Sequence, residues 1–337
     1  MTQKICFILS LFILSACTKR EDKVSVDLTI YAHDSLLSKK GLLTEAIPLF
    51  ELERKCKVSA LSVGDAAQLP ARLELDEKRK VYPAQILMGL DSLSFSSVAG
   101  HLIKDAKYLP DGFEFVVPEL KDQLGFYPYD YGALTLIVDT DKIKAPHSIF
   151  ELVDSKYKKK IIFEDPRTST PGLQFVLYIN SLLPEAKFKK FFKELSQNWL
   201  TLTPGWDEAY GLFLKEQAPL VWSYMSSQAY HEKHDAKKER FRAAVFKEGH
   251  PLQVEGMALI AKGISSEKEL SLSKSFLDFI LSKKIQSLVM TKNWMLPVRQ
   301  DVELLPEFNH LPKSYKKIKP NFNQNINEIL QTWRDSF

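Results

Sequence analysis

The chain has 337 residues, which is enough for two packed lobes rather than one minimal domain. Hydrophobic residues make up 45% of it and charged residues 26%, the balance of an ordinary globular protein. The formal net charge is only +4, and the basic residues form no stripe with aromatic residues, so we expect no nucleic-acid partner.

The N-terminus has the features of a bacterial lipoprotein signal. A positively charged start is followed by an apolar run over residues 5–14, which is too short for a bilayer span of about 20 residues. The sequence Leu14-Ser15-Ala16-Cys17 then resembles a lipobox, in which cleavage before the cysteine exposes it to lipidation. We therefore expect a signal peptide over 1–16, a lipid on Cys17 and a polar tether over 17–25, on the periplasmic face of a bacterial membrane. A plain signal peptide with an incidental cysteine is the alternative.

Cysteine usage agrees with this interpretation. Cys6 would be lost with the signal and Cys17 would carry lipid, so Cys56 is left alone in the folded body. One thiol makes no internal disulfide. We expect Cys56 to be a packed structural thiol rather than a nucleophile.

The first third of the body alternates strands with helices. Apolar periodicity predicts strands over 26–32, 58–63 and 84–90, with helices over 44–56 and 69–78. This βαβαβ order predicts a parallel sheet that is covered by helices.

The rest of the chain continues the α/β pattern. Strands are predicted over 132–139, 160–163, 220–224, 241–246 and 252–261. Helices are predicted over 148–155, 171–183, 187–197, 207–215, 267–290 (with a break) and 323–334. Crossovers at 132–139 and 252–261 would join two lobes, one formed by 26–131 plus 262–337 and the other by 132–261. A ligand would then bind in the cleft between them, at the carboxyl ends of the strands.

One polar turn has the pattern of an anion or hydroxyl site. Between the strand that ends at Phe163 and the next helix, Thr170 is an N-cap candidate and Pro171 suits the first helical turn. Free N–H groups at a helix start favour an anion, and the Ser169 and Thr170 hydroxyls add donors. Ordinary capping of the helix is the alternative.

Several aromatic residues stand at the ends of predicted elements. Trp206 precedes a helix, where it either staples that helix or faces a ligand. Tyr224 and Tyr230 flank a hydroxyl-rich loop, Trp294 enters a turn, and Trp222 is expected in the core. Aromatic faces attract a cationic heterocycle.

These segments resemble the periplasmic thiamine-binding proteins of bacterial ABC importers. The resemblance rests on the blocks D-P-R-T-S-T-P-G-L (165–173), G-W-D-E-A-Y-G-L-F-L-K (205–215), S-Y-x-x-S-x-A-Y-H (223–231), E-G-H-x-L-Q-V-E (248–255) and N-W-M-x-P-V (293–298). It implies a type II two-lobed periplasmic binding fold that closes over thiamine, thiamine phosphate or thiamine diphosphate. It also implies an inner-membrane permease as partner, no cofactor and no catalysis.

The resemblance carries a set of binding positions onto this chain. They are Asp65, Ala66, Ser169, Thr170, Trp206, Tyr224, Met225, Ser226, Ser227, Tyr230 and Trp294. Tyr230 and Trp294 would contact the aromatic rings, Asp65 would offset the cation, and the Ser169–Thr170 helix start would receive the hydroxyl or phosphate.

The chain departs from the family pattern in its first lobe. Ala66 stands where the family has Gly, and His33 stands where it has an aromatic residue before Asp-Ser. A tryptophan expected near residues 39–41 is missing. A protonated His33 would repel a thiazolium ring.

Two other functions compete with this interpretation. A receptor of the same fold could take a metal, an oxyanion or another cation, although no metal-ligand spacing is convincing and no metal site is expected. A thiaminase-like enzyme would need a cysteine nucleophile in the cleft, and neither Cys17 nor Cys56 belongs to the cleft motifs.

Overall fold

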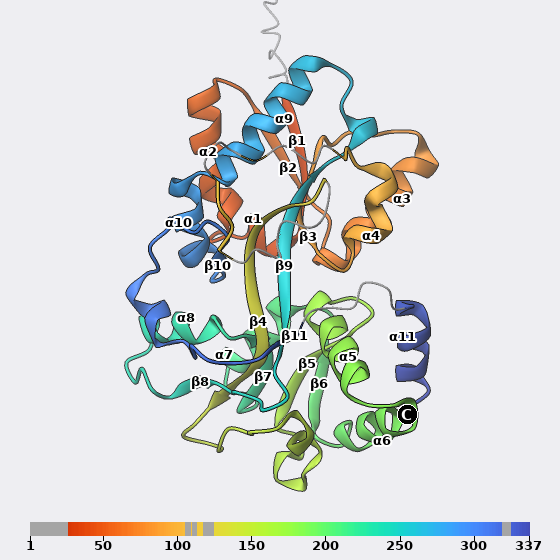
Figure 1. Ribbon diagram of the computed structural model, residues 1–337, viewed down its shortest axis with the longest axis vertical. Coiled ribbons are helices and arrows are strands. Elements are labelled where there is room, and N and C mark those ends of the chain that lie inside the picture. Colours follow the sequence, from red (N-terminus) through yellow and green to blue (C-terminus); the bar gives the residue numbers. More distant parts are fainter. Residues whose placement is uncertain (1–25, 105–108, 110–112, 117–124, 319–324) are drawn as a thin grey trace, which may run out of the picture.

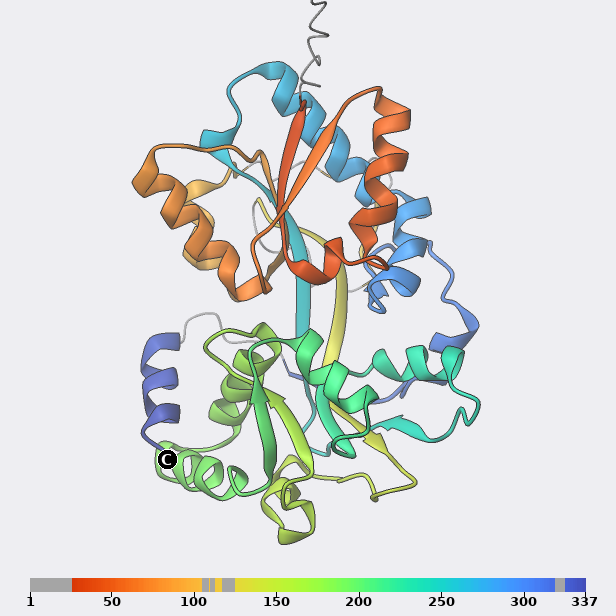
Figure 2. The same ribbon diagram turned by 180° about the vertical axis from the view of Figure 1, so that it is seen from behind.

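The computed structural model describes residues 26–104, 109, 113–116, 125–318 and 325–337. The expected signal peptide and Cys17 lie outside these residues. The described chain forms two α/β lobes, one above the other in Figure 1. The view from behind shows the same two lobes, with β4 (Tyr127–Asp139) and β9 (His250–Leu259) running between them (Figure 2).

The first lobe is built on three parallel strands. These are β1 (Leu28–Ala32), β2 (Val58–Ser62) and β3 (Ile86–Asp91), in the spatial order β2-β1-β3. The helices of this lobe are α1 (Asp34–Leu37), α2 (Leu42–Arg54), α3 (Leu69–Arg79), α4 (Phe95–Val98), α9 (Glu267–Ile280) and α10 (Lys283–Lys292). Phe50 of α2 packs edge-on against Phe276 of α9, with ring centroids 5.0 Å apart. This contact fixes two outer helices to each other over the sheet.

Two long antiparallel strands join the lobes. Every residue of β4 and of β9 is buried, because the strands are covered along their whole length. β9 pairs with β3 in the first lobe, and β4 pairs with β7 (Leu220–Tyr224) in the second. The crossing strands expected over 132–139 and 252–261 overlap β4 and β9, although β9 ends at Leu259.

The second lobe repeats the parallel pattern. β5 (Ile161–Glu164) pairs in parallel with β7, and β6 (Trp199–Thr203) pairs in parallel with β5. β8 (Phe241–Ala243) pairs with β4. The helices are α5 (Thr170–Leu182), α6 (Glu185–Leu195), α7 (Trp206–Leu214) and α8 (Ser227–His234). Trp222 of β7 is fully buried as expected, and its indole N–H donates to the carbonyl of Pro171 at 3.0 Å. The strand behind the cleft is thereby tied to the start of α5.

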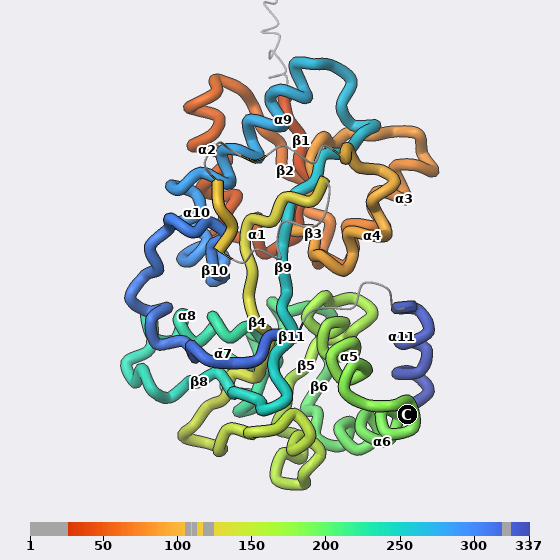
Figure 3. Tube along the Cα trace, viewed as in Figure 1, coloured from red at the N-terminus to blue at the C-terminus, as the bar shows by residue number. Residues whose placement is uncertain are grey.

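The C-terminal segment departs from the predicted division of the lobes. After α10 and the short β10 (Leu296–Pro297), the chain passes along the second lobe (Figure 3). There β11 (Lys317–Ile318) pairs with β9, and α11 (Ile326–Arg334) packs on α5 and α6. The structure thus has β11 and α11 on the second lobe, whereas 262–337 was assigned as a whole to the first. The apolar face of α11 indicated burial, but not the surface that buries it.

Three local predictions also need correction. Residues 148–155 form two 3₁₀ turns, Ile149–Val153 and Ser155–Tyr157, instead of an α-helix. The hydroxyl-rich loop after Tyr224 is mostly helix α8, and β6 was not predicted. The α/β class itself is confirmed.

Candidate functional site

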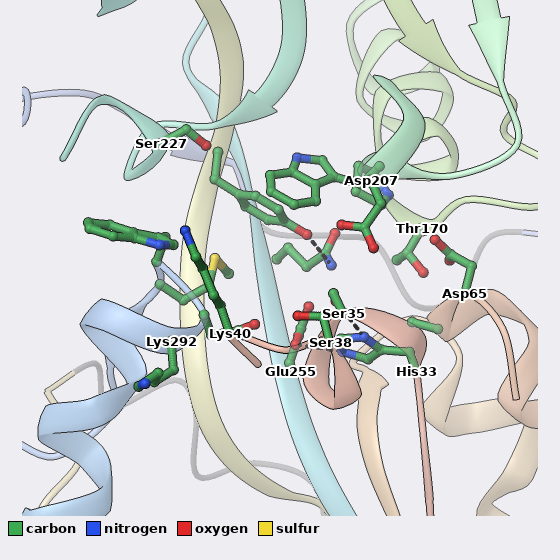
Figure 4. Close-up of a pocket in the computed structure, with 18 residues that line it drawn as sticks. His33, Ser35, Ser38, Lys40, Asp65, Thr170, Asp207, Ser227, Glu255 and Lys292 are labelled. Atoms are coloured by element: carbon green, nitrogen blue, oxygen red, sulfur yellow. Dashed lines mark hydrogen bonds and ion pairs between the residues drawn. The ribbon is translucent and has the colours of Figure 1, made fainter. Parts of the chain in front are cut away.

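A cavity of about 190 Å³ lies between the lobes. Figure 4 shows its side chains converging from both lobes and from β9. Its lining consists of His33, Ser35, Ser38, Lys40, Asp65, Ala66, Thr170, Pro171, Trp206, Asp207, Tyr224, Ser227, Gln253, Glu255, Lys292, Asn293, Trp294 and Met295. About half of these residues follow a strand or open a helix, the position at which parallel α/β sheets bind ligands.

The first lobe contributes the loops after β1 and β2. His33 directly follows β1, and its imidazole lies against the backbone of Gly89. A Cβ at Gly89 would come within 2.0 Å of His33 Cδ2, and Gly89 has a φ of +85° that favours glycine. Asp65 caps a 3₁₀ turn after β2 by accepting from the Ala67 N–H at 3.2 Å. Both side chains are therefore held by local backbone geometry.

The second lobe contributes three helix starts and the end of β7. Thr170 and Pro171 open α5, Trp206 opens α7 and Ser227 opens α8. The Trp206 indole N–H donates to Ser223 Oγ at 2.8 Å, and its ring stacks on Tyr210 with centroids 4.9 Å apart. Trp206 is thus held in place at the cavity wall, which supports the ligand-facing interpretation over simple stapling.

The crossing strand β9 supplies a polar floor. Gln253 donates to the Tyr224 hydroxyl at 2.8 Å, and this bond orients the phenol at the end of β7. Two residues along, Glu255 accepts from the Tyr129 hydroxyl at 2.7 Å and lies 3.4 Å from His33 Nε2. Alternate residues of a strand share a face, so both side chains reach the cavity.

Three carboxyl groups give the cavity its negative charge. Burial between the lobes raises the pKa of Asp65 to about 6, and desolvation also raises the pKa of Asp207. Burial opposes the charge on Glu255 too, but its contacts with His33 and Tyr129 outweigh burial and lower its pKa. At neutral pH the cavity therefore holds carboxylate charge that the neighbouring cationic side chains do not fully balance.

Another buried acid, Asp130, lies beside this group. Asp130 of β4 is fully buried, and burial together with the charge of Glu255 raises its pKa well above the usual range. The Asn293 side-chain amide donates to Asp130 Oδ2 at 2.5 Å. Asp130 thus fixes Asn293, and with it the neighbouring Trp294.

Trp294 is presented by a strained backbone. It has a φ of +54°, a conformation that is costly for a non-glycine residue and that persists where surrounding contacts impose it. The Tyr230 ring meets the indole edge-on at 5.2 Å, and Phe308 lies parallel to it at 6.5 Å. These contacts hold the indole of Trp294 in place at the cavity wall.

The charges of the cavity are arranged unequally. Figure 4 shows Asp65, Asp207 and Thr170 on one side of the cavity and Lys40 and Lys292 on the other. Lys292 is paired with Glu45 at 2.5 Å. Lys40 makes no ion pair within the described part of the chain, and it lines the cavity, so its ammonium group can meet a ligand.

The structure brings seven of the eleven predicted binding residues to the cavity. They are Asp65, Ala66, Thr170, Trp206, Tyr224, Ser227 and Trp294. Ser169, Met225, Ser226 and Tyr230 do not line it. Ser169 is fully buried just behind the wall, Met225 and Ser226 line a separate cavity beside Tyr131, and Tyr230 supports Trp294 from behind. Their contact with a ligand stays a prediction.

Sequence reasoning missed several polar residues of the site. Asp207, Gln253, Glu255 and Asn293 all lie inside motif blocks, but no binding role was assigned to them. A signal was present for Glu255 and Gln253, because two polar residues at alternate positions of an otherwise apolar strand share one face. The closeness of Glu255 to His33, which is 222 residues away in the sequence, needed the fold.

Comparison with known proteins now places the chain. The family model of the bacterial extracellular solute-binding proteins matches residues 89–318. The chain belongs to this family. The thiamine-binding periplasmic protein of Brucella abortus is 35% identical to this solute-binding protein over 315 residues, which are 90% of this chain and 88% of that one. The resemblance drawn from the motif blocks is confirmed.

Solved structures agree with the two-lobed fold. A periplasmic thiamin-binding protein matches this solute-binding protein with a TM-score of 0.82 and 32% identity, covering 92% of this chain and 95% of that one. A ferric binding protein from Campylobacter jejuni matches with a TM-score of 0.74 at 19% identity, covering 92% and 99%, and shares the fold alone. The predicted periplasmic binding fold is therefore confirmed.

The described residues offer neither a metal cluster nor a membrane-spanning helix. Within them, no three His, Cys, Asp or Glu side chains are grouped so as to hold a metal ion. None of the helices in the described ranges is both long and apolar enough to cross a bilayer. Cys56 is buried beside β2 and is not among the cavity-lining residues.

Proposed function

We propose that this chain is the substrate-binding component of an ABC importer and that it binds thiamine or a thiamine phosphate ester between its lobes. The observation that carries the proposal is the juxtaposition of Asp65, Asp207 and Glu255 with the Trp206 and Trp294 rings in one cavity. Carboxylates and aromatic faces together suit a flat, permanently charged heterocycle. The curated relative of this chain from Brucella carries the corresponding name, which supports the same ligand.

The proposed binding mode follows from the two sides of the cavity. The thiazolium cation lies near the carboxylates, and Trp294 offers a ring face that is worth about 0.5–2 kcal/mol as a cation–π contact. The Thr170 hydroxyl, at the start of α5, receives the hydroxyl or phosphate tail, because the Thr170 N–H is engaged by Asp65 and Pro171 has no N–H to donate. Closure of the lobes around the ligand presents a joint surface to the permease.

A calorimetric titration tests this function directly. The folded body is unfolded and refolded to strip any co-purified molecule, and is then titrated with thiamine, its monophosphate and its diphosphate. Binding of at least one form with a stoichiometry of one supports the proposal. If all three fail to bind at millimolar concentration while the protein is folded by circular dichroism, the proposal is wrong.

We further propose that the site binds without catalysing a reaction. A thiaminase-like reaction needs a nucleophile in the cleft, and no cysteine is among the described residues that line the cavity. Incubating the protein with thiamine and an added amine nucleophile should leave the vitamin intact by chromatography. Time-dependent cleavage would support the enzyme instead. Another ligand on the same fold, such as a metal or an oxyanion, is tested by adding it in competition with thiamine.

The lipid anchor is a separate proposal that rests on residues 1–25. The expected lipobox ends at Cys17 and the tether is polar, so a diacylglycerol on Cys17 would hold the protein at the membrane. A Cys17→Ala variant of the full chain should keep its signal unprocessed by the lipoprotein peptidase and carry no lipid by mass spectrometry. Equal lipid content in both proteins would refute the anchor.

A further inference from the structure

His33 is a buried histidine at the centre of the acidic side of the cavity. It is 6% exposed, and its two ring nitrogens have different partners. Ser35 Oγ lies 2.8 Å from Nδ1, and Glu255 Oε2 lies 3.4 Å from Nε2. A histidine whose two nitrogens are both engaged is held in one orientation, and in this case it contacts a carboxylate that faces the ligand.

The ring can change protonation state without moving. In the neutral form, Nε2–H donates to Glu255 and Nδ1 accepts from the Ser35 hydroxyl. In the protonated form, Nδ1–H donates to Ser35 Oγ after that hydroxyl rotates, and the bond to Glu255 becomes an ion pair. The ring lies close against Gly89, where an added Cβ would come within 2.0 Å of His33 Cδ2. A proton is therefore gained or lost at fixed geometry.

Carboxyl groups face this ring from three elements. Glu255 comes from β9, Asp207 from α7 in the other lobe, and Asp65 from the turn after β2. Burial of His33 lowers its pKa, but the hydrogen bond and charge of Glu255, followed by the charges of Asp65 and Asp207, outweigh burial and raise the pKa above 6.5. The Tyr129 hydroxyl also donates to Glu255 and stays protonated, because burial raises its pKa.

We propose that His33 is a proton-dependent determinant of ligand affinity, whose protonation cancels the Glu255 charge that the bound cation would otherwise meet. The inference rests on the proposed function, since it takes the ligand to be a permanently charged azolium. Neutral His33 leaves three carboxylates for that cation. Protonated His33 pairs with one of them and repels the cation itself.

The direction of the pH dependence follows from linkage. A bound cation disfavours the protonated ring, so ligand binding lowers the pKa of His33 and expels a proton. Affinity for the cation is therefore highest above that pKa and falls as the pH falls through it. Asp65 adds to the fall, because its pKa of about 6 means that acid also removes this carboxylate. A variant of His33 is needed to separate the two contributions.

The test compares wild-type protein with His33→Gln and His33→Phe. Gln keeps a hydrogen-bonding side chain that does not titrate. Phe introduces an aromatic residue of the kind expected at this position from the resemblance to the periplasmic thiamine-binding proteins. Thiamine affinity is measured by calorimetry from pH 8.5 to pH 5.5, after thermal unfolding shows that each variant is folded. A neutral analogue, in which a thiophene ring replaces the thiazolium and the aminopyrimidine is kept, reports effects unrelated to the cation charge.

Between pH 8.5 and pH 5.5 we expect the thiamine affinity of the wild type to fall about tenfold more than that of either variant. A tenfold difference corresponds to a shift of one unit in the pKa of His33 when the ligand binds. The neutral analogue should lose no more affinity in the wild type than in the variants. Equal losses of thiamine affinity in wild type and in a folded variant would overturn the inference while leaving the proposed function intact.

A spectroscopic measurement makes the assignment independent of variants. Histidine ring resonances, followed by NMR without and with saturating thiamine, should show one pKa that falls on binding and that is missing in His33→Gln. An unchanged His33 pKa would overturn the inference even if affinity changed with pH. If the wild-type protein fails to bind thiamine at every pH, the proposed function is overturned instead.

Discussion

Trp294 is the residue on which ring recognition depends most. Its indole is fixed by Tyr230 and Phe308 at a strained φ of +54°, so the aromatic face is prepared before a ligand arrives. We expect Trp294→Ala to weaken thiamine binding about tenfold, the size of one well-desolvated cation–π contact. Calorimetry measures the change, and Trp294→Phe, which keeps a ring, should lose less. Unchanged affinity in Trp294→Ala would remove this residue from the site.

Lys40 opposes the acidic side of the cavity with a positive charge. It lines the cavity, and the neighbouring Lys39 does not. We expect Lys40→Ala to raise affinity for the thiamine cation a few-fold and to lower affinity for thiamine diphosphate, because one like charge is removed in the first case and one opposite charge in the second. Titrating both ligands against Lys40→Ala and the control Lys39→Ala measures this. A shift in the same direction for both ligands would contradict the charge argument.

For single residues, the sequence indicated which side-chain types the site uses better than it indicated where each side chain lies. Trp206, Tyr224 and Trp294 were found from motif blocks, and all three line the cavity. Tyr230 was assigned to the ligand, yet it lies behind Trp294, because α8 turns its side chain toward that indole. Glu255 went unassigned, since its approach to His33 depends on the twist and register of β9.

Among the elements, α5 is held unusually close to β5. A Cβ on Gly172 would lie 2.5 Å from the carbonyl oxygen of Glu164, and a backbone atom cannot move aside easily. We expect Gly172→Ala to lower the free energy of unfolding by about 1–3 kcal/mol, as overpacking does. Because α5 carries Thr170, ligand affinity should fall as well.

Gly211 in α7 is the matched control for this substitution. A Cβ there meets nothing within 4 Å, so Gly211→Ala should stabilise by about 0.5–1 kcal/mol, the usual gain of alanine in a helix. Chemical denaturation measures both variants. If both substitutions stabilise the protein, the contact between α5 and β5 can accommodate a Cβ and the overpacking argument is wrong.

Elements with strong periodicity were predicted well, and short or polar ones were not. The predicted strand over 220–224 coincides with β7, and the predicted helix over 69–78 lies within α3 (Leu69–Arg79). α8, with the sequence SQAYHEKH, has no apolar period, and it is buried because β8 and the turn near Phe308 pack on it. Its helical state therefore comes from tertiary contacts, which one sequence does not encode locally.

The whole molecule is organised around two lobes that meet at the ligand site. Asp65 belongs to the first lobe, yet its carboxylate interacts with the backbone N–H of Thr170, at the start of α5 in the second. A Cβ on Gly205, in the loop before α7, would lie 3.1 Å from Asp65 Oδ2. One ionisable side chain thus links the lobes at the cleft.

Proton binding at Asp65 should therefore influence lobe closure. Between the lobes, burial raises the pKa of Asp65 from 3.8 to about 6. In an open form the carboxyl group is solvated and its pKa lies nearer the ordinary value. An acid with the higher pKa in the closed form binds its proton more tightly there, so acidification through pH 6 favours closure of the ligand-free protein.

Small-angle X-ray scattering of ligand-free protein at pH 7.5 and pH 5 measures this effect. We expect the radius of gyration to decrease at pH 5 in the wild type. In Asp65→Asn the two radii should be closer together, because the amide does not titrate, and any contraction that is left reflects His33 and Asp207, which also face the cleft. Asp154→Asn, at an exposed turn of the second lobe, should behave as the wild type. Expansion of the wild type on acidification would contradict the linkage, since desolvation of an ionised Asp65 must oppose closure and its protonation must relieve that cost.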